Sequence, residues 1–497
     1  MFRRLEKDEF LRRAENAGRV VVFREFLADR ETPVAAFSRL GRDEEAFLLE
    51  SVAGGESRGR YSYLGIEPSG SIVDRGDRVE FAGPDGARET LGDADALAAL
   101  KRIFAEASFA PAPELPSFQG GAVGYVSYDA VAGFEPAARV KPDPSTPRMA
   151  FLLVDTMLVF DNVLGTVTVA VVADVRKSAS AAAAYDAAMS KIEAVHERLL
   201  SAASIARLFS GDRIAERGVL GGFESEMSRE EFAEAVSKCK EAIRAGEVIQ
   251  IVPSRKFTAK TGLSALSLYR ALRSVNPSPY NFMMRIGSKT LIGSSPEELV
   301  KLSGARASTA PIAGTRPRGA TKADDAELER GLKADPKEMA EHVMLVDLGR
   351  NDLGRVCETG SVKVDSFAHV ERYSHVMHLV SNVSGTLAEG KDAFDLLRAV
   401  FPAGTLTGAP KVRAMQLLGG IEKSPRGIYG GAAGYFSYSG DMDFAIVIRT
   451  MVLENGILEM RSGAGIVADS DPDREYEETE NKAKAVFEAA KLAEELS

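Results

Sequence analysis

Apolar and polar positions alternate over short runs in the first 200 residues of the chain, and later they recur with helical spacing. The runs Met149–Val154 and 165–171 have the length and the β-branched content of strands. Alanine- and serine-rich sequence with helical spacing follows at 178–208. We therefore expect a β-rich, mostly antiparallel N-terminal part that ends in a helix.

The C-terminal part opens with a helix whose start and end are both marked. Ser228 and Glu231 form a capping box, and Gly246 ends the helical pattern. The apolar stripe of this helix consists of Phe232, Val236, Cys239 and Ile243. Because Cys239 lies on the stripe, we interpret it as a core residue and not as a nucleophile. A strand is expected next, at 248–252.

Two later helices start with a proline in the first turn behind an aspartate. One begins at Pro336 after Asp335, and the other begins at Pro472 after Asp471. Before them, the run 311–319 contains two prolines, two glycines and two arginines. This composition predicts a rigid basic turn that lets a ligand approach the backbone and that can bind carboxylates.

Composition divides the chain into two parts. A glycine-containing polar stretch at 209–222 predicts a linker between an N-terminal domain at 1–208 and a C-terminal domain at 223–497. The segments 120–129 and 430–438 also resemble each other, and an apolar β-type run follows each of them. This faint repeat favours duplicated sheet halves that face each other.

Bulk properties limit the class of protein. The chain has 497 residues, of which 45% are apolar and 27% charged, as in globular proteins with two or three cores. A net charge of −10 without any Lys/Arg-rich run argues against a nucleic-acid partner. The two cysteines form no CxxC pair, and neither a signal peptide nor a membrane-spanning run is found. We expect a cytoplasmic protein that does not associate with membranes.

Four glutamates form the clearest candidate site. Glu338 and Glu341 lie three residues apart on the Pro336 helix, and Glu475 and Glu478 do the same on the Pro472 helix. Residues with this spacing share one helix face, and such oxygen ligands without histidine suit Mg²⁺. Acidic residues also stabilise the first turn of any helix, so each pair alone has a purely structural interpretation.

His378 lies in an apolar run and has two interpretations. If the run is a strand, alternation places His378 on one face and His375, Met377 and Leu379 on the other. A histidine in such a run is either a satisfied core residue or a general acid–base group, because it exchanges a proton near neutral pH.

Three further segments favour a small anionic substrate. The stretch 404–411 lacks the GK[ST] ending of a nucleotide-binding loop and predicts a tight turn that presents hydroxyl and amide groups to an anion. Arg449, in the β-type run 444–451, is a buried-looking charge that needs an anionic partner. The stretch 461–465 offers backbone N–H groups without bulky side chains. Together these features indicate a site for a small dianion.

These motifs resemble component I of the anthranilate synthases, a group of chorismate-utilising enzymes, and the resemblance extends over nearly the whole chain. It rests on six stretches in the same order, namely 249–255, 311–319, 340–352, the His378 run, 404–415 and the Glu475–Lys482 helix. The resemblance implies an α+β fold in which two largely antiparallel β-sheets are sandwiched between helices. It also implies that ammonia adds to chorismate as the 4-hydroxyl leaves, and that pyruvate is then eliminated.

The same resemblance implies roles for single residues. Glu341 and Glu478 would bind Mg²⁺ directly, Glu338 and Glu475 would act through water or as proton donors, and His378 would serve pyruvate elimination. The residues that would hold the substrate are Arg449, Tyr429, Lys482, Gly463, Ala464, Gly465, Ala313, Gly314 and Thr315, with Thr405 hydrogen-bonding nearby.

Two positions distinguish the related reactions. Relatives that add water have a lysine base where this chain has Gln250, and a neutral amide cannot deprotonate water. Aminodeoxychorismate synthases typically have a lysine that attacks the ring where this chain has Ala313. Both positions favour direct attack by ammonia and hence anthranilate. A synthase that stops at an aminodeoxychorismate or aminodeoxyisochorismate intermediate is the alternative, and a catalytically silent tryptophan-binding regulator is a third possibility.

The resemblance also implies a regulatory site and a partner. Glu50 and Ser51, in an LLES motif, together with Pro279, Tyr280 and Asn281, would form a feedback site for tryptophan. Neither cysteine lies in a glycine-flanked nucleophile turn, so no glutamine-hydrolysing module is present. Ammonia would therefore come from a separate glutamine amidotransferase subunit, in a heterotetramer with two copies of each chain.

Overall fold

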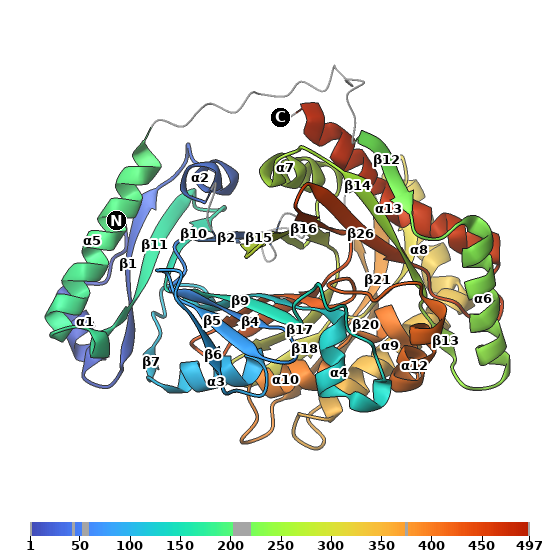
Figure 1. Ribbon diagram of the computed structural model, residues 1–497, viewed down its shortest axis with the longest axis horizontal. Coiled ribbons are helices and arrows are strands. Elements are labelled where there is room, and N and C mark those ends of the chain that lie inside the picture. Colours follow the sequence, from blue (N-terminus) through green and yellow to red (C-terminus); the bar gives the residue numbers. More distant parts are fainter. Residues whose placement is uncertain (1, 42–44, 52–58, 202–219, 373–375, 496–497) are drawn as a thin grey trace.

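Two large β-sheets form the centre of the molecule, and helices cover them on the outside (Figure 1). The computed structural model describes residues 2–41, 45–51, 59–201, 220–372 and 376–495. Nearly all neighbouring strands are antiparallel; the pairing of β1 (Arg19–Leu27) with β7 (Phe109–Ala110) is parallel. The predicted α+β class with two largely antiparallel sheets between helices is confirmed.

The first sheet, called sheet 1 below, has twelve strands in the order β12-β14-β26-β25-β16-β15-β2-β3-β10-β11-β1-β7. Besides β1 and β7 it contains β2 (Ala46–Glu50), β3 (Tyr61–Gly65), β10 (Thr156–Asp161), β11 (Thr166–Asp174), β12 (Leu220–Ser225), β14 (Ser254–Lys260), β15 (Tyr280–Ile286), β16 (Lys289–Ser295), β25 (Thr450–Glu454) and β26 (Ile457–Gly463).

The second sheet, sheet 2, runs in the order β19-β21-β18-β17-β24-β23-β8-β9-β4-β5-β6, with β20 also paired to β21. Its strands are β4 (Gly70–Asp74), β5 (Val79–Ala82), β6 (Arg88–Leu91), β8 (Gly121–Val126), β9 (Met149–Val154), β17 (Glu298–Ser303), β18 (Arg306–Thr309), β19 (Ile312–Pro317), β20 (Lys363–Arg372), β21 (Val376–Thr386), β23 (Ala432–Ser437) and β24 (Met442–Ile446). Two short strands, β13 (Gln250–Ile251) and β22 (Gly408–Ala409), pair separately.

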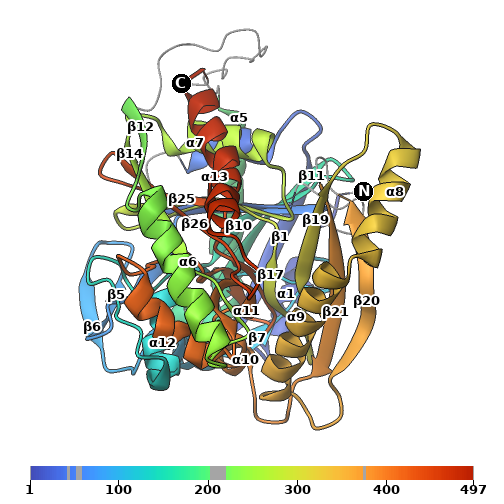
Figure 2. The same cartoon turned by 90° about the vertical axis from the view of Figure 1, so that its right-hand side faces the viewer.

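Helices pack on the outer faces of both sheets (Figures 1 and 2). They are α1 (Lys7–Ala14), α2 (Pro33–Leu40), α3 (Ala96–Ala105), α4 (Val131–Phe134), α5 (Ala181–Leu200), α6 (Arg229–Arg244), α7 (Ala265–Val275), α8 (Lys322–Ala334), α9 (Pro336–Gly354), α10 (Ala393–Val400), α11 (Gly404–Thr407), α12 (Lys411–Ile421) and α13 (Pro472–Glu495). Helix α5 packs on β1 and β11, α13 packs on β26 and α7, and α9 lies against β19 and β21. Helix α9 follows α8 directly, and α13 follows β26 of sheet 1.

The two similar sequence segments lie side by side in the middle of sheet 2. Strands β8 and β23 pair there, and Gly124 is opposite Gly434. Likewise β2 and β15 pair in the middle of sheet 1. The predicted N-terminal and C-terminal parts therefore each supply half of both sheets, and the boundary between them runs through the sheets rather than between layers.

Several predicted elements are confirmed. Helix α6 has the full capping box of Ser228 and Glu231, and Cys239 is fully buried in its core. Asp335 accepts hydrogen bonds from the first backbone N–H groups of α9, and Asp471 accepts one from Arg474 at the start of α13. The predicted helix within 178–208 is α5. No helix in the described part of the chain is long and apolar enough to cross a bilayer.

Other predictions about local structure are wrong. The run 311–319 is no turn: most of it forms β19 at the edge of sheet 2, where prolines are tolerated because one side of the strand needs no partner. A bulge interrupts its pairing at Gly314, whose φ of +64° suits glycine. The strand expected at 248–252 has only two paired residues, and the run 444–451 is broken between β24 and β25.

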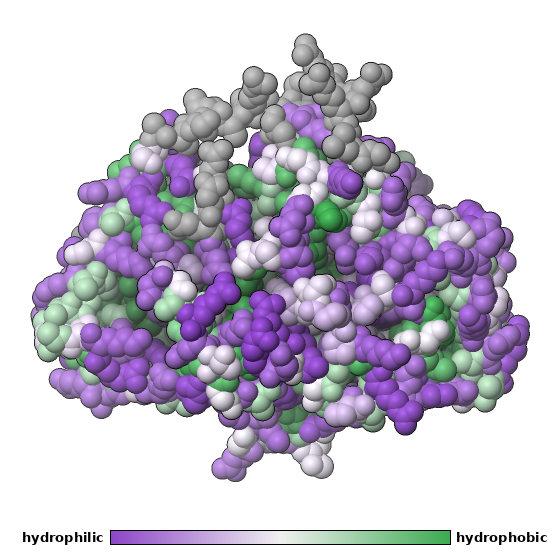
Figure 3. Space-filling view, in the orientation of Figure 1, coloured by the Kyte–Doolittle hydropathy of each residue, from purple (hydrophilic) through white to green (hydrophobic). Residues whose placement is uncertain are grey.

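Part of the sequence prediction cannot be compared with the structure. His375 and positions 209–219 of the predicted linker lie outside the described residues, while Leu220–Ser225 forms β12. On the face drawn in Figure 3 hydrophilic side chains cover most of the surface, and apolar atoms are visible mainly in recesses between them.

Candidate active site

Helix α9, which packs on β19 and β21 of sheet 2, and helix α13, which packs on β26 of sheet 1, carry the predicted site glutamates (Figure 2). Gln250 on β13 donates a hydrogen bond from Nε2 to Oε1 of Glu341 on α9, at 3.0 Å. Lys482 on α13 donates to the carbonyl oxygen of Gly463 on β26, at 3.1 Å. These contacts bring residues distant in sequence to one location.

Helix α9 presents one carboxylate to the interior and one to an arginine. Glu341 is half-buried, and burial raises the pKa of its carboxyl, with additional effects from the nearby charges of Glu338 and Glu478. Glu338 accepts a hydrogen bond from Nη1 of Arg316 at 2.9 Å, and Arg316 also pairs with Asp335. The arginine of β19 is therefore bound to carboxylates of the protein itself.

Helix α13 is held in place by a buried arginine. The guanidinium of Arg255 stacks 3.9 Å from the ring centre of Tyr476, donates from Nε to Thr479 at 2.9 Å, and pairs with Glu480. Arg255 is fully buried. All three partners lie on one turn of α13. This arginine therefore fixes the turn that carries Glu478 and that directly follows Glu475.

The two predicted ligands on α13 have different surroundings. Glu475 is buried, and burial raises the pKa of its carboxyl, with a smaller contribution from the charge of Glu478. Its Oε2 atom is buried and makes no hydrogen bond within the described residues. Glu478 is exposed and forms an ion pair with Lys482 at 2.6 Å.

The four glutamates fit a hard divalent cation in charge and in donor type. In the described residues no three His, Cys, Asp or Glu side chains converge tightly enough to hold a metal as they stand. A Mg²⁺ ion would nevertheless give the orphaned Oε2 of Glu475 a partner, and it would offset the burial and the repulsion from Glu338 and Glu478 that raise the pKa of Glu341.

His378 is buried on β21 beside the bulge of β19. Its Nδ1 atom lies 3.1 Å from the carbonyl oxygen of Gly314 and 3.0 Å from the hydroxyl of Thr315. A carbonyl only accepts hydrogen bonds, so Nδ1 carries the proton in the neutral ring and Nε2 is the basic nitrogen. Burial lowers the pKa of His378, which keeps the ring neutral near pH 7.

Glu297 is a site residue that the sequence did not reveal. It lies in the connection from β16 to β17, is buried, and burial raises the pKa of its carboxyl to about 7. The Thr405 hydroxyl and the charges of Lys482 and Arg449 act in the opposite direction. A carboxyl that is half protonated at neutral pH can serve as a general acid. The only sequence signal is Pro296 between two β-type runs, which carries no chemical information.

Arg449 lies in the connection from β24 to β25, with a left-handed backbone at φ +49°. Within the described residues it forms no ion pair within 4.0 Å, so the anionic partner predicted for it is not a side chain of that part of the protein. Its Nη1 instead lies 3.5 Å from Oδ1 of Asn276. Burial lowers the pKa of Arg449, and the charge of Glu297 acts against this. Its positive charge is therefore available to an anionic ligand.

The other predicted substrate residues lie on several elements, with Gly463 at the end of β26 and Ala313 and Thr315 on β19. Burial raises the pKa of Tyr429 to about 12, so its hydroxyl is a hydrogen-bond donor at neutral pH. A Cβ atom on Gly463 would lie 2.9 Å from that hydroxyl, and one on Gly465 would lie 2.8 Å from Nε2 of Gln250. Ala464 and Ala313 are buried, Thr315 is exposed, and Thr405 is half-buried.

The residues predicted to bind tryptophan are brought together only in part. Glu50 and Asn281 are directly opposite each other on β2 and β15. The carboxylate of Glu50 is buried and already occupied, since it accepts from the hydroxyl of Tyr269 at 2.5 Å and pairs with Arg273 at 2.9 Å.

Tyr280 lies next to Asn281 on β15 and therefore on the opposite face of the sheet from Glu50. Its hydroxyl donates toward Glu298 and Asp443 of sheet 2, at 3.1 and 3.0 Å. Pro279 is buried and Ser51 is half-buried. The structure thus divides these five residues between two faces of sheet 1.

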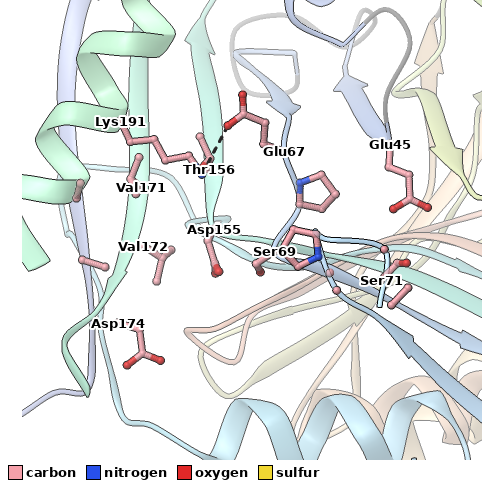
Figure 4. Close-up of a pocket in the computed structure, with 18 of the residues that line it drawn as sticks. Glu45, Glu67, Ser69, Ser71, Asp155, Thr156, Val171, Val172, Asp174 and Lys191 are labelled. Carbon is pink, nitrogen blue, oxygen red and sulfur yellow. Dashed lines mark ion pairs between the residues drawn. The ribbon is translucent and has the colours of Figure 1, made fainter. Parts of the chain in front are cut away.

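A large cavity lies apart from the predicted site residues, between strands that the N-terminal part of the chain supplies to the two sheets (Figure 4). It measures about 960 Å³, and residues around it include Glu67, Asp155, Thr156 and Lys191. Glu67 and Lys191 point toward each other as an ion pair in Figure 4. None of the predicted site residues lines this cavity, so its size alone does not mark the chemistry.

Comparison with known proteins gives a consistent result. The chain matches the sequence model of the family described as chorismate binding enzyme over residues 44–488. Among curated proteins it is 42% identical to anthranilate synthase component 1 of Pseudomonas aeruginosa, over 99% of both chains. It is 41% identical to the protein of the same name from Acetivibrio thermocellus, over 98% of this chain and 99% of the relative.

Solved structures agree. Anthranilate synthase component I from Streptococcus pneumoniae matches with a TM-score of 0.76 and 34% identity, over 93% of this chain and 99% of that one. The menaquinone-specific isochorismate synthase from Escherichia coli matches with a TM-score of 0.70 and 20% identity, over 97% and 98% of the two chains. This second similarity concerns the fold alone.

Proposed function

Because the chain belongs to the family of chorismate-binding enzymes, we propose that it catalyses the anthranilate synthase reaction. Chorismate and ammonia would give anthranilate, pyruvate and water. The observation that carries the proposal is the proximity of Glu297 and Arg449 between the sheets. A buried acid that is half protonated near pH 7 and a cation without an ion pair suit a substrate that is an anion and has a hydroxide as its leaving group.

In the first step Glu297 donates its proton to the 4-hydroxyl group of chorismate, which leaves as water. The lone pair of ammonia forms a bond to the ring at C2, and the ring double bonds shift as the C–O bond breaks. The ammonium group then loses a proton, which restores the acid. We assign this donation to Glu297 rather than to Glu338, because the carboxylate of Glu338 is already engaged in an ion pair with Arg316.

In the second step the neutral His378 removes the proton from the carbon that carries the new amino group. Its Nδ1–H is held by the Gly314 carbonyl, so Nε2 is the atom that accepts this proton. The bond between the ring and the enolpyruvyl oxygen breaks, the ring becomes aromatic, and enolpyruvate takes up a proton to give pyruvate. The lowered pKa of His378 keeps the imidazole in its basic form at neutral pH.

The substrate carboxylates are held by groups from both sheets. We propose that Arg449 and the Tyr429 hydroxyl bind one carboxylate, while Lys482 and the backbone N–H groups of 463–465 bind near the other. Glu341 and Glu478 would hold Mg²⁺ directly and Glu338 and Glu475 would act through water; the ion, when bound, neutralises the ring carboxylate and polarises the ring. Ala313, Gly314 and Thr315 form the wall beside His378.

The choice of nucleophile follows from Gln250 and Ala313. The amide of Gln250 cannot deprotonate water, and its Nε2 donates to Glu341. Ala313 has no nucleophilic atom. Ammonia, which needs no deprotonation before it attacks, is therefore the nucleophile that this site accepts.

We further propose that a glutamine amidotransferase subunit supplies ammonia, in a heterotetramer of two copies of each chain, and that tryptophan inhibits. Tryptophan would bind at the seam of β2 and β15, through Glu50, Ser51, Pro279, Tyr280 and Asn281. Binding there requires Glu50 to exchange the contacts with Tyr269 and Arg273 for the ligand's ammonium group.

The proposed reaction is tested with the purified chain, chorismate, Mg²⁺ and ammonium, with anthranilate measured by fluorescence and pyruvate by a coupled assay. Equal amounts of anthranilate and pyruvate are expected, with none formed from glutamine until an amidotransferase subunit is added. If a non-aromatic amine accumulates without pyruvate, the chain is instead an aminodeoxychorismate or aminodeoxyisochorismate synthase. Titration with tryptophan in the same assay tests the feedback site.

A further inference from the structure

Arg449 differs from the other interior arginines of the C-terminal half in what holds it. Arg255, Arg426 and Arg461 each pair with a carboxylate, namely Glu480, Glu422 and Glu226. For Arg449 no such pair exists within the described residues. Its backbone carbonyl accepts from the N–H of Ser294 at 3.2 Å, and its left-handed φ of +49° costs about 1 kcal/mol in a residue with a side chain.

The guanidinium is held by a neutral amide. Nη1 of Arg449 lies 3.5 Å from Oδ1 of Asn276, at the C-terminal end of α7. An amide oxygen accepts the hydrogen bond without neutralising the charge, so Arg449 keeps its attraction for a substrate carboxylate. A carboxylate at the same position would compete with the substrate.

Asn276 is itself fixed on three sides. Its backbone N–H donates to Leu272 at 2.9 Å, and its Nδ2 donates to the carbonyl oxygen of Ser294 at 3.2 Å. The hydroxyl of Ser294 lies within hydrogen-bond distance of the Asn276 carbonyl and 2.8 Å from Oδ1 of Asn281. Ser294 and Asn281 are both almost fully buried. The amide therefore has one orientation, with the oxygen toward Arg449.

We propose that Asn276 is a positioning residue for Arg449: its amide oxygen orients the guanidinium toward a substrate carboxylate while leaving the charge unpaired. This inference rests on the proposed function, which supplies the carboxylate. Asn276 also connects the proposed substrate site with the paired strands β2 and β15. The connection runs through Ser294, whose hydroxyl contacts both Asn276 and Asn281 of β15.

The test compares steady-state kinetics of Asn276→Ala and Asn276→Asp in the ammonia-dependent assay. For Asn276→Ala the KM for chorismate should rise about three- to tenfold with kcat changed less than twofold, since the lost hydrogen bond is long, at 3.5 Å, and contributes no more than an ordinary neutral one. For Asn276→Asp the KM should rise further, because the new carboxylate pairs with Arg449. Asn382→Ala, which removes a half-buried amide that donates to Ser366 in sheet 2, is the control and should leave the KM unchanged.

A double-mutant cycle separates positioning from a general structural effect. In an Arg449→Ala background the Asn276→Ala change should alter the KM less than twofold, because the residue through which Asn276 acts is gone. An equal rise in both backgrounds, or a loss of kcat without a change in KM, overturns the proposal. If the unaltered chain forms no anthranilate, the proposed function fails instead, so the two failures are distinguishable.

Discussion

Replacement of Glu297 by glutamine should reduce activity and at the same time raise stability at alkaline pH. The amide keeps the shape of the side chain and removes the proton that the 4-hydroxyl needs. General acid catalysis contributes about 10²–10⁴-fold to a rate, so we expect kcat to fall by that factor. The loss in kcat of the unaltered enzyme as pH rises through about 7 should disappear in the variant, because this limb reports the deprotonation of Glu297.

The stability effect has the opposite sign and follows from the same pKa. Burial raises the pKa of Glu297 from 4.5 to about 7, so the folded state holds a proton that the unfolded state has lost between these values. Folding is penalised progressively from pH 4.5 to about 7, and the penalty is constant above. At about 1.4 kcal/mol for each tenfold change in proton affinity, the full penalty is roughly 3 kcal/mol. Glutamine removes it, so the variant gains stability at pH 8 and almost none near pH 4.5.

The assay therefore has two arms, anthranilate fluorescence across pH 6–9 and thermal unfolding at pH 5 and pH 8. Glu298→Gln is the matched control, because the adjacent carboxyl bonds to the hydroxyl of Tyr280 instead of facing Arg449. It should keep most of the activity. The reasoning is refuted if Glu297→Gln retains more than a tenth of kcat, or if its gain in melting temperature is the same at both pH values.

Three further predictions concern the proposed Mg²⁺ site and the segments that support it. Removal of divalent cations with EDTA should abolish anthranilate formation, and added Mg²⁺ should restore it; full activity in EDTA would exclude the metal. Arg255→Lys should lower the free energy of unfolding by about 2 kcal/mol and raise the Mg²⁺ concentration needed for half-maximal rate. The reason is that lysine cannot stack on Tyr476 and bond to α13 at once. An unchanged Mg²⁺ requirement would contradict this role. Gly465→Ala should lower kcat/KM about 10- to 100-fold, since the new Cβ would lie 2.8 Å from Nε2 of Gln250. Gly419→Ala, on α12 with open space around it, is its control and should be neutral.

The sequence predicts local structure well where the signal is itself local. Capping residues at Ser228 and Asp335 and the apolar stripe of α6 depend on neighbours within one or two turns, so their helices were predictable. The run 311–319 was misinterpreted as a turn because its prolines and glycines are also compatible with a bulged edge strand. Only the pairing with β21, more than sixty residues away, decides between the two.

The candidate site shows the same limit in another form. Glu341 and Gln250 are ninety-one residues apart in sequence, and the resemblance to known motifs brought both into the prediction. Glu297 and Arg449 acquire their properties from burial in connections between the two sheets, which no periodicity announces. The raised pKa of Glu297 follows from the removal of water, a property of the packed molecule and not of the residue.

The two halves of the chain cross between the sheets at corresponding points but carry different charges there. In the N-terminal half the chain crosses from sheet 1 to sheet 2 between β3 and β4 and returns between β9 and β10. In the C-terminal half it crosses between β16 and β17 and returns between β24 and β25. In the C-terminal half the crossing segments carry Glu297 and Arg449, and the corresponding N-terminal segments carry Glu67 and Asp155, which line the large cavity of Figure 4.

The carboxylate of Asp155 accepts from the Tyr438 hydroxyl at 3.1 Å and stands where the other half has its unpaired arginine. A dicarboxylate would meet an attractive charge beside Arg449 and a repulsive one beside Asp155. On the proposed function, the charge at this crossing point, and not cavity size, distinguishes the two halves as substrate sites.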